Sequence, residues 1–140
     1  MSYIDSSKEG GKLALEQLEH EQVIWLTTVR ADGQPQTSAV WFLWTGREFV
    51  IYSMPDKPKL RNIQHNPRVS LNFNTDPHGM HVVAIEGTAS IDEGYPSAVD
   101  MPAIIEKYRE GIARIGTTPE EFSATYRVPV IVTPRKFRYF

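Results

Sequence analysis

Three basic side chains, Lys57, Lys59 and Arg61, lie within five residues in the stretch SMPDKPKLRNI, which spans residues 53–63. The cluster follows a run of β-forming residues and comes where a helix is predicted to begin, with Pro58 in its first turn. Cations at the start of a helix oppose its dipole, whereas an anion at the same place is stabilised by it. The cluster is therefore either a solvated helix face or a binding site for an anion such as a phosphate.

Two polar side chains flank these cations. Ser53 ends the preceding strand, where its hydroxyl can donate a hydrogen bond to an anion, and Asn62 follows Arg61 in the helix. The whole chain carries a formal net charge of −2, so a basic site in this segment has to be local. The same net charge argues against a nucleic-acid partner, which would need a basic, aromatic face.

Aromatic residues are concentrated before this segment, with Trp25 on one predicted strand and Trp41, Phe42 and Trp44 on the next. Adjacent residues of a strand point to opposite faces, so Trp41 and Phe42 cannot both enter one core. Either the second face is open to a planar ligand or a second subunit, or ordinary packing covers both faces. An open aromatic face on this strand would favour a homodimer.

Other kinds of chemistry have little support in the sequence. The chain has no cysteine, which removes disulfides, thiolate nucleophiles and cysteine-bound zinc. It contains no hydrolase, P-loop, dinucleotide-binding or zinc-protease motif. His78 and His81 are three residues apart in a turn that leads into a strand, and this context favours surface histidines over metal ligands. No metal site is predicted.

Length and composition indicate one domain over residues 1–140, with 41% hydrophobic and 23% charged residues. The N-terminal segment is polar and lacks the apolar core of a secretion signal, and no run is long enough to span a membrane. We therefore expect a cytoplasmic protein with no membrane partner, and the lack of cysteine fits a reducing compartment.

The pattern of apolar and turn residues predicts six strands. They are expected at residues 22–29, 36–46, 47–53, 68–75, 80–91 and 128–140. Asp32-Gly33 predicts a tight turn between the first two strands, and Gly87 predicts a bend or a bulge in the fifth. The strands do not alternate regularly with helices, so the order predicts a mainly β fold, an antiparallel barrel with peripheral helices.

Helices are predicted in four segments. The first is amphipathic, begins after the loose Glu-Gly-Gly at residues 9–11 and runs to His20. The second covers residues 58–65, and the third has an apolar stripe between residues 101 and 115. The fourth begins with Thr118 as its N-cap, followed by a proline in the first turn.

Three stretches in this order resemble a known family: TTVRADGQPQTSAVWF at residues 27–42, IYSMPDKPKLRNIQHNPRVSL at 51–71 and VVAIEGTASI at 82–91. The chain resembles the split-barrel flavin-binding superfamily that includes pyridoxamine phosphate oxidase. Within it, the chain looks most like the flavin/deazaflavin oxidoreductases that use coenzyme F420. The similarity runs roughly from residue 23 to residue 91 and includes the last strand.

The resemblance implies a six-stranded split β-barrel of the FMN-binding type. It also implies a homodimer with two equivalent cofactor sites at its interface, to which the second subunit lends the segment Met80–Val82. The basic segment after the third strand would hold the cofactor phosphate. The residues that match cofactor-binding positions are Gln36, Ser38, Ser53, Lys57, Lys59, Asn62 and Arg61, the last with a structural ion pair as its alternative role.

The chain departs from the phosphate-oxidase relatives at one informative place. Those relatives often carry an arginine on the second strand, and the sequence PQTSAVW at residues 35–41 has none. The departure favours coenzyme F420, whose tail carries a phosphate and carboxylates, and leaves FMN as the alternative cofactor. A non-catalytic flavin or deazaflavin carrier is a further alternative.

The reaction that the resemblance implies is hydride transfer from reduced F420 to an electron-poor small organic substrate. Because the cofactor carries the difficult chemistry, few side-chain catalysts are expected. The proton donor would be Tyr126, His78, His81 or solvent. The sequence does not distinguish between these donors and does not identify the substrate.

Overall fold

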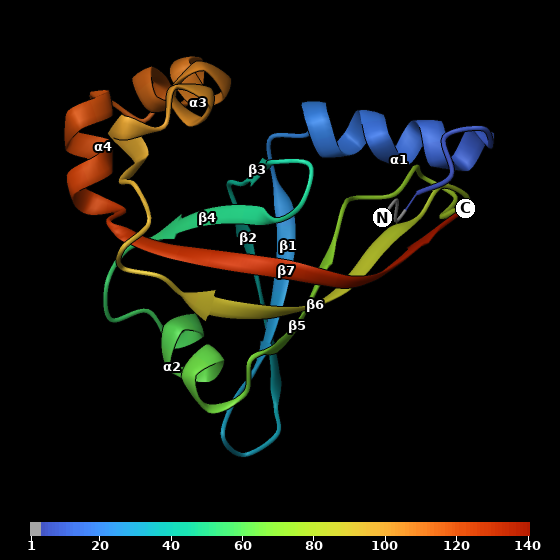
Figure 1. The fold of residues 1–140 in the computed structure, drawn as a ribbon, viewed down its shortest axis with the longest axis horizontal. Helices are drawn as coiled ribbons and strands as arrows, with labels where there is room; N and C mark the ends of the chain where they lie inside the picture. The colour runs from blue at the N-terminus through green and yellow to red at the C-terminus, as the bar shows by residue number, and fades with distance from the viewer. Residues whose placement is uncertain (1–3) are drawn as a thin grey trace.

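The computed structural model describes residues 4–140, and these contain seven β-strands, four α-helices and one 3-10 helix. All seven strands join in one antiparallel sheet with the order β2-β1-β5-β6-β7-β4-β3. The sheet curls so that β1 and β2 cross behind β4, β6 and β7 (Figure 1). The strands are β1 (Ile24–Val29), β2 (Pro35–Val40), β3 (Leu43–Trp44), β4 (Phe49–Ser53), β5 (Arg68–Asn72), β6 (Val83–Ile91) and β7 (Val128–Tyr139). The predicted mainly β split barrel is confirmed.

The helices lie around the curled sheet. They are α1 (Glu9–His20), α2 (Pro58–His65), the 3-10 helix η1 (Ala98–Asp100), α3 (Pro102–Arg114) and α4 (Pro119–Thr125). Helices α3 and α4 lie together at one end of the molecule, α1 lies near the C-terminus, and α2 lies below the end of β6 in Figure 1. We call η1, α3 and α4, which span residues 98–125, the helical cap.

The strand count differs from the predicted six because the strand expected at 36–46 breaks after Val40. At the break, the backbone N–H of Phe42 donates to the hydroxyl of Tyr108 over 2.8 Å, and the Phe42 carbonyl oxygen lies 2.9 Å from the same hydroxyl. These backbone groups bond to a side chain of the helical cap instead of a neighbouring strand. The chain therefore leaves β2 and starts the short strand β3 at Leu43.

Gly87 produces the irregularity that the sequence predicts. The pairing of β6 with β7 shifts between Glu86 and Gly87, so that one extra residue is accommodated in β7. A β-carbon at Gly87 would lie 2.7 Å from the carbonyl oxygen of Thr133, closer than two such atoms can approach. The predicted bulge is confirmed, and its cause is the close approach of the two backbones.

The first helix begins earlier than predicted, since Glu9, Gly10 and Gly11 form its first turn. Gly11 is buried there, and a β-carbon on it would meet the carbonyl oxygen of Asp5 at 1.9 Å. The glycine is therefore needed for this contact, and the expectation that the helix follows it was wrong. The predicted cap of α4 is confirmed, because the Thr118 hydroxyl accepts from the backbone N–H of Glu121.

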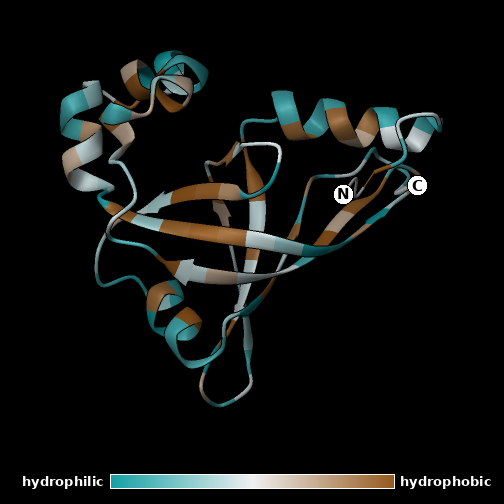
Figure 2. Ribbon diagram, viewed as in Figure 1, coloured by the Kyte–Doolittle hydropathy of each residue, from teal (hydrophilic) through white to brown (hydrophobic). Residues whose placement is uncertain are grey.

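Two separate hydrophobic cores stabilise the fold. The larger one fills the barrel with side chains such as Phe42, Phe49 and Phe73, and the smaller one lies within the helical cap around Ile104, Tyr108 and other apolar residues. The body of β4 and most of the first half of β7 are coloured as hydrophobic in Figure 2, whereas the arrowhead of β4 is pale. Both faces of these strands are largely buried, and a cavity lies beside β4, where the barrel and the cap meet.

No helix among residues 4–140 has the length and apolar character needed to cross a membrane.

Candidate cofactor-binding site

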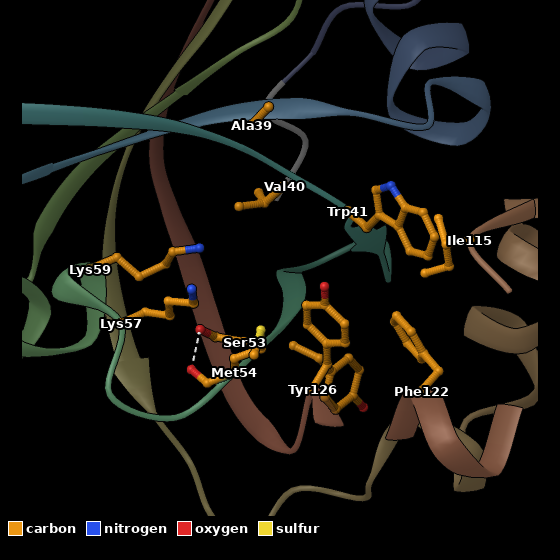
Figure 3. Close-up of a pocket in the computed structure, with 11 residues that line it drawn as sticks. Ala39, Val40, Trp41, Ser53, Met54, Lys57, Lys59, Ile115, Phe122 and Tyr126 are labelled. Carbon is orange, nitrogen blue, oxygen red and sulfur yellow. Dashed lines mark hydrogen bonds between the residues drawn. The ribbon is translucent and has the colours of Figure 1, made fainter. Parts of the chain in front are cut away.

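The turn between β4 and α2 presents two lysines to the same space. Asp56 adopts a left-handed conformation with φ of 63°, which sharply redirects the chain after Ser53. Lys57 is the N-cap residue of α2, and Lys59 lies in the first turn after Pro58. Both amines project into one cavity in Figure 3, side by side and directed toward the aromatic residues opposite.

The cavity has a volume of about 380 Å³ and lies between the barrel and the helical cap. Small-molecule sites in proteins start at about this size. Its cationic end is formed by Lys57 and Lys59 beside Ser53. The remaining lining is aromatic or apolar and comes from β2, the segment after it, β4 and the cap: Ala39, Val40, Trp41, Tyr52, Met54, Ile115, Phe122 and Tyr126.

A second cavity of about 350 Å³ shares the same two lysines. Its other lining residues are Thr28, Gln36, Thr37, Ser38 and Pro58, and all of these except the proline have uncharged polar side chains. The lysine pair therefore stands between an aromatic cavity and a polar cavity. We call these the aromatic cavity and the polar cavity below.

The electrostatics of the lysine pair favour an anion. Lys59 is half-buried, and burial followed by the positive charge of Lys57 lowers the pKa of its amine below the ordinary value. No carboxylate lies among the residues that line either cavity in the described part of the chain. A bound anion would offset both the burial and the repulsion, since charge-assisted bonds to an ammonium are strong.

Asn62 lies beneath the site, 6% exposed, and is hydrogen-bonded to two side chains. Its amide nitrogen donates to the hydroxyl of Thr28 over 3.0 Å and to Oε1 of Gln36 over 2.8 Å. This bond from α2 holds the side-chain oxygen of Gln36. The amide N–H groups of Gln36 can then donate to a ligand in the polar cavity. Asn62 lines neither cavity, so its predicted direct contact with a cofactor stays a prediction.

Arg61 is exposed and lines neither cavity. No carboxylate of residues 4–140 lies within ion-pair distance of it, so the alternative role in a structural ion pair is not seen within the described chain. The structure therefore separates the predicted cluster. Lys57, Lys59 and Ser53 meet at one cavity, Gln36 and Ser38 line the other, and Arg61 and Asn62 lie outside both.

Trp41 and Phe42 point to opposite faces, and packing covers Phe42 completely and Trp41 in part. Phe42 is in the barrel core, whereas Trp41 stacks on Tyr108 with ring centroids 4.5 Å apart and on Phe122 at 5.5 Å. A β-carbon at Gly111 would lie only 3.1 Å from the Trp41 ring, so α3 approaches it closely. The rest of the Trp41 side chain is half-buried and lines the aromatic cavity, so this face is partly packed and partly open to a ligand, and the homodimer stays a prediction. The argument from resemblance is unaffected.

The predicted histidine donors lie elsewhere. His78 and His81 belong to the segment between β5 and β6, which runs beside the C-terminus and away from α2 and α4 (Figure 1). The backbone of Val82 pairs with that of Phe140, and the carboxylate of Asp76 accepts from the backbone N–H of His81 over 2.6 Å. Neither histidine, and no residue of Met80–Val82, lines either cavity within this chain.

Sequence reasoning missed most of the aromatic end. Tyr52, Met54, Ile115 and Phe122 line the aromatic cavity, and none of them was predicted as a site residue. Only one signal pointed to them. Phe122 and Tyr126 are four residues apart on the fourth helix and so share a face of it, with ring centroids 4.9 Å apart.

The curled antiparallel sheet with a cationic cavity under a helical cap defines a split-barrel protein of the flavin-binding type. The family model described as pyridoxamine 5'-phosphate oxidase matches residues 12–139, and the chain belongs to this family. The superfamily of such split barrels contains flavin-binding oxidoreductases.

Solved structures agree with this assignment. A Listeria innocua protein proposed to be a pyridoxamine 5'-phosphate oxidase is 28% identical, with a TM-score of 0.65 over 92% of this chain and 96% of that one. A structure described as an F420 reductase is 27% identical, with a TM-score of 0.63 over 88% and 94% of the two chains. A heme storage protein from Vibrio cholerae shares the fold at 18% identity, with a TM-score of 0.62 over 92% of each chain.

Proposed function

We propose that this protein is an oxidoreductase that binds coenzyme F420 and reduces an electron-poor small organic substrate. The observation that carries the proposal is the position of Lys57 and Lys59 between the aromatic and the polar cavity. A phosphate held by this pair can carry a substituent on each side. F420 has this form, with a ring system on one side of its phosphate and a carboxylate-bearing tail on the other.

The chain's own residues would bind and orient the cofactor. Lys57 and Lys59 would hold the phosphate by charge-assisted bonds, with Ser53 beside the chain that joins the phosphate to the ring. Gln36 and Ser38 would contact the tail in the polar cavity. The apolar walls would enclose the ring and keep water from it, and the bound reduced deazaflavin would supply the hydride.

An FMN-dependent oxidoreductase is the second candidate, and the family description favours it. FMN ends at its phosphate, so it would occupy the aromatic cavity and the lysine pair but leave the polar cavity without a ligand. Among the described residues 4–140, none that lines either cavity is acidic, which suits both cofactors. The polar cavity is thus the part of the site that separates the two proposals.

The deciding experiment is a parallel titration of the purified protein with F420 and with FMN, followed by tryptophan fluorescence and by calorimetry. We expect tighter binding of F420. Tighter binding of FMN would move the proposal to the second candidate, and binding of neither would overturn both. Oxidation of bound reduced F420 on addition of a panel of enones and quinones then separates an enzyme from a carrier, since a carrier would show no turnover.

We further propose a homodimer with cofactor sites at its interface, in which the segment Met80–Val82 of one chain completes the site of the other. The support is the family membership together with the exposure of Met80, which is 74% exposed and precedes the half-buried His81 and Val82. Light scattering at micromolar concentration should give twice the chain mass. A monomer mass would contradict the proposal.

A further inference from the structure

One phenol at the aromatic cavity has no hydrogen-bond partner within the described chain. Three tyrosines lie in this region, and two of them are hydrogen-bonded. The Tyr52 hydroxyl donates to the carbonyl oxygen of Pro96 over 2.8 Å, and the Tyr108 hydroxyl bonds to backbone atoms of Phe42 and Gln22. The structure shows no bond of this kind for the hydroxyl of Tyr126, which lines the cavity. Tyr126 is half-buried, and polar groups that are removed from water in a protein usually have a hydrogen-bond partner, which a ligand in the cavity would supply.

The ring of Tyr126 is held in place although its hydroxyl is free. Its backbone N–H closes the last turn of α4 by donating to the carbonyl oxygen of Phe122 over 2.8 Å. Its ring stacks on that of Phe122 and packs against the core of the helical cap. Figure 3 shows Tyr126 between Met54 and Phe122, across the cavity from the two lysines. The phenol is therefore positioned in advance of any ligand.

The other donors of the aromatic cavity are unsuited to giving up a proton. The Ser53 hydroxyl donates to the carbonyl oxygen of Met54 over 2.8 Å. The indole N–H of Trp41 can donate a hydrogen bond but does not ionise in water. Lys57 and Lys59 are assigned to the anion. A phenol carries its proton at neutral pH and can also lose it, so Tyr126 is the one lining side chain of the described residues that is left for this role.

We propose that Tyr126 touches the substrate and is the acid that protonates it, with a carbonyl group as the substrate feature that it recognises. This inference rests on the proposed function. For an enone, the β-carbon gains a hydride, the electrons of the C=C bond move onto the carbonyl oxygen, and this oxygen takes the phenol proton from Tyr126. The resulting enol tautomerises to the saturated ketone. The phenolate takes a proton from water, and oxidation of the reduced cofactor returns one, so atoms and charge balance.

The first test compares the wild type with Tyr126→Phe, which removes only the hydroxyl and breaks no described bond. The probes are reduced F420 and cyclohexenone. We expect kcat to fall by about a hundredfold, the usual scale of general acid catalysis, while the Kd for F420 stays within about twofold. Tyr95→Phe is the matched control, because Tyr95 lines neither cavity, and it should keep the wild-type kcat. An unchanged kcat in Tyr126→Phe, or a loss of kcat in His78→Ala or His81→Ala alone, would overturn the inference.

The second test needs no turnover. The probes are 1-tetralone and tetralin, which differ only in the carbonyl group, titrated by calorimetry with and without bound F420. Wild type should bind the ketone about tenfold more tightly than the hydrocarbon, and Tyr126→Phe should lose this preference. If the preference is absent from the wild type or persists in the variant, the contact is contradicted. If the preference depends on Tyr126 while F420 neither binds nor reacts, the proposed function and the acid role fail together, and only the contact between Tyr126 and a carbonyl group stands.

Discussion

The two ends of the aromatic cavity are built in opposite ways. The cationic end comes from seven consecutive residues, Ser53 to Lys59, at the junction of a strand and a helix. The aromatic end is collected from the break after β2, from β4, and from both helices of the cap, with residues as far apart in the chain as Trp41 and Tyr126. A short local segment can bind a phosphate, because the start of a helix directs its backbone N–H groups toward the ligand. The aromatic walls that would select a substrate form only when the tertiary fold brings distant parts of the chain together.

This contrast suggests a division of labour. The cationic end fits any ligand with a suitably placed phosphate, so it would fix the cofactor. The aromatic end depends on how the cap sits against the barrel, so changes in the cap would alter the substrate and leave the cofactor bound. Variants of each end should therefore separate two properties, cofactor affinity and substrate turnover.

The largest effect is expected from Lys57→Ala/Lys59→Ala, which removes the cationic end. Each charge-assisted bond to a phosphate contributes about 1.5–3 kcal/mol, so the double variant should weaken F420 binding by at least a hundredfold. Calorimetric or fluorescence titration measures the Kd. The free energy of unfolding should not fall, because the two amines repel each other. Burial and the charge of Lys57 also lower the pKa of Lys59, so its charged form is disfavoured in the folded protein.

Two further variants serve as comparisons for the double variant. Lys12→Ala, on α1, should keep the wild-type affinity. Arg61→Ala removes a charge from α2 outside both cavities and should weaken binding far less than the double variant does. An unchanged Kd in the double variant would show that the phosphate is held elsewhere.

The next effect concerns the anchor of the cap, and the variant is Tyr108→Phe. The Tyr108 hydroxyl is buried and bonds to the backbone at Phe42 and Gln22, so its removal leaves a buried N–H without a partner. The expected loss is about 1–3 kcal/mol in the free energy of unfolding, measured by urea denaturation. F420 affinity should change little and substrate turnover should fall, because Tyr108 supports Trp41 at the aromatic end.

A loss of F420 affinity as large as that of the double lysine variant would contradict the proposed division between the two ends. Tyr139→Phe is a useful control for the stability measurement. Its hydroxyl also accepts a backbone N–H, that of Asp5, over 2.7 Å, but it lies far from the cap in the fold. This control should lose stability without losing turnover.

The same contrast explains what the sequence predicted and what it did not. The hairpin at Asp32-Gly33 and the bulge at Gly87 follow from local rules, as does the meeting of Lys57 with Lys59. The break at Trp41 and Phe42 follows from a bond to Tyr108, which is 66 residues away from Phe42, and no local pattern encodes it. For the same reason the stacking of Trp41 on Tyr108 and Phe122 was not predicted, and Ile115 and Phe122 were missed as lining residues.

Asn62 illustrates an intermediate case. Its place in the motif predicted a ligand contact. Its neighbours Leu60 and Ile63, however, are core residues, so this face of α2 packs against the barrel. An asparagine there is buried and needs partners, which Thr28 and Gln36 provide. The motif therefore marks a segment that lines both cavities, without distinguishing residues that line them from residues that lie beneath them.

The smallest effect is a pH dependence at the junction of cap and barrel. The amine of Lys107 on α3 donates to the Phe42 carbonyl oxygen over 2.8 Å and lies 3.6 Å from the centre of the Phe42 ring. Burial lowers its pKa to about 8 from 10.5, and the charge of Glu21 opposes the shift. The folded protein therefore releases this proton at a lower pH than the unfolded chain does.

The sign of the effect follows from this order. Below about pH 8 both states hold the proton, and the full cost of burying the charged amine is present. Between about pH 8 and 10.5 the unfolded chain binds more protons, so this cost declines and stability rises with pH. The difference in unfolding free energy between the wild type and Lys107→Met isolates the contribution, because the other titrating groups are common to both. This difference should move in favour of the wild type as the pH rises, and a constant difference would show that the amine is not buried against Phe42 in solution.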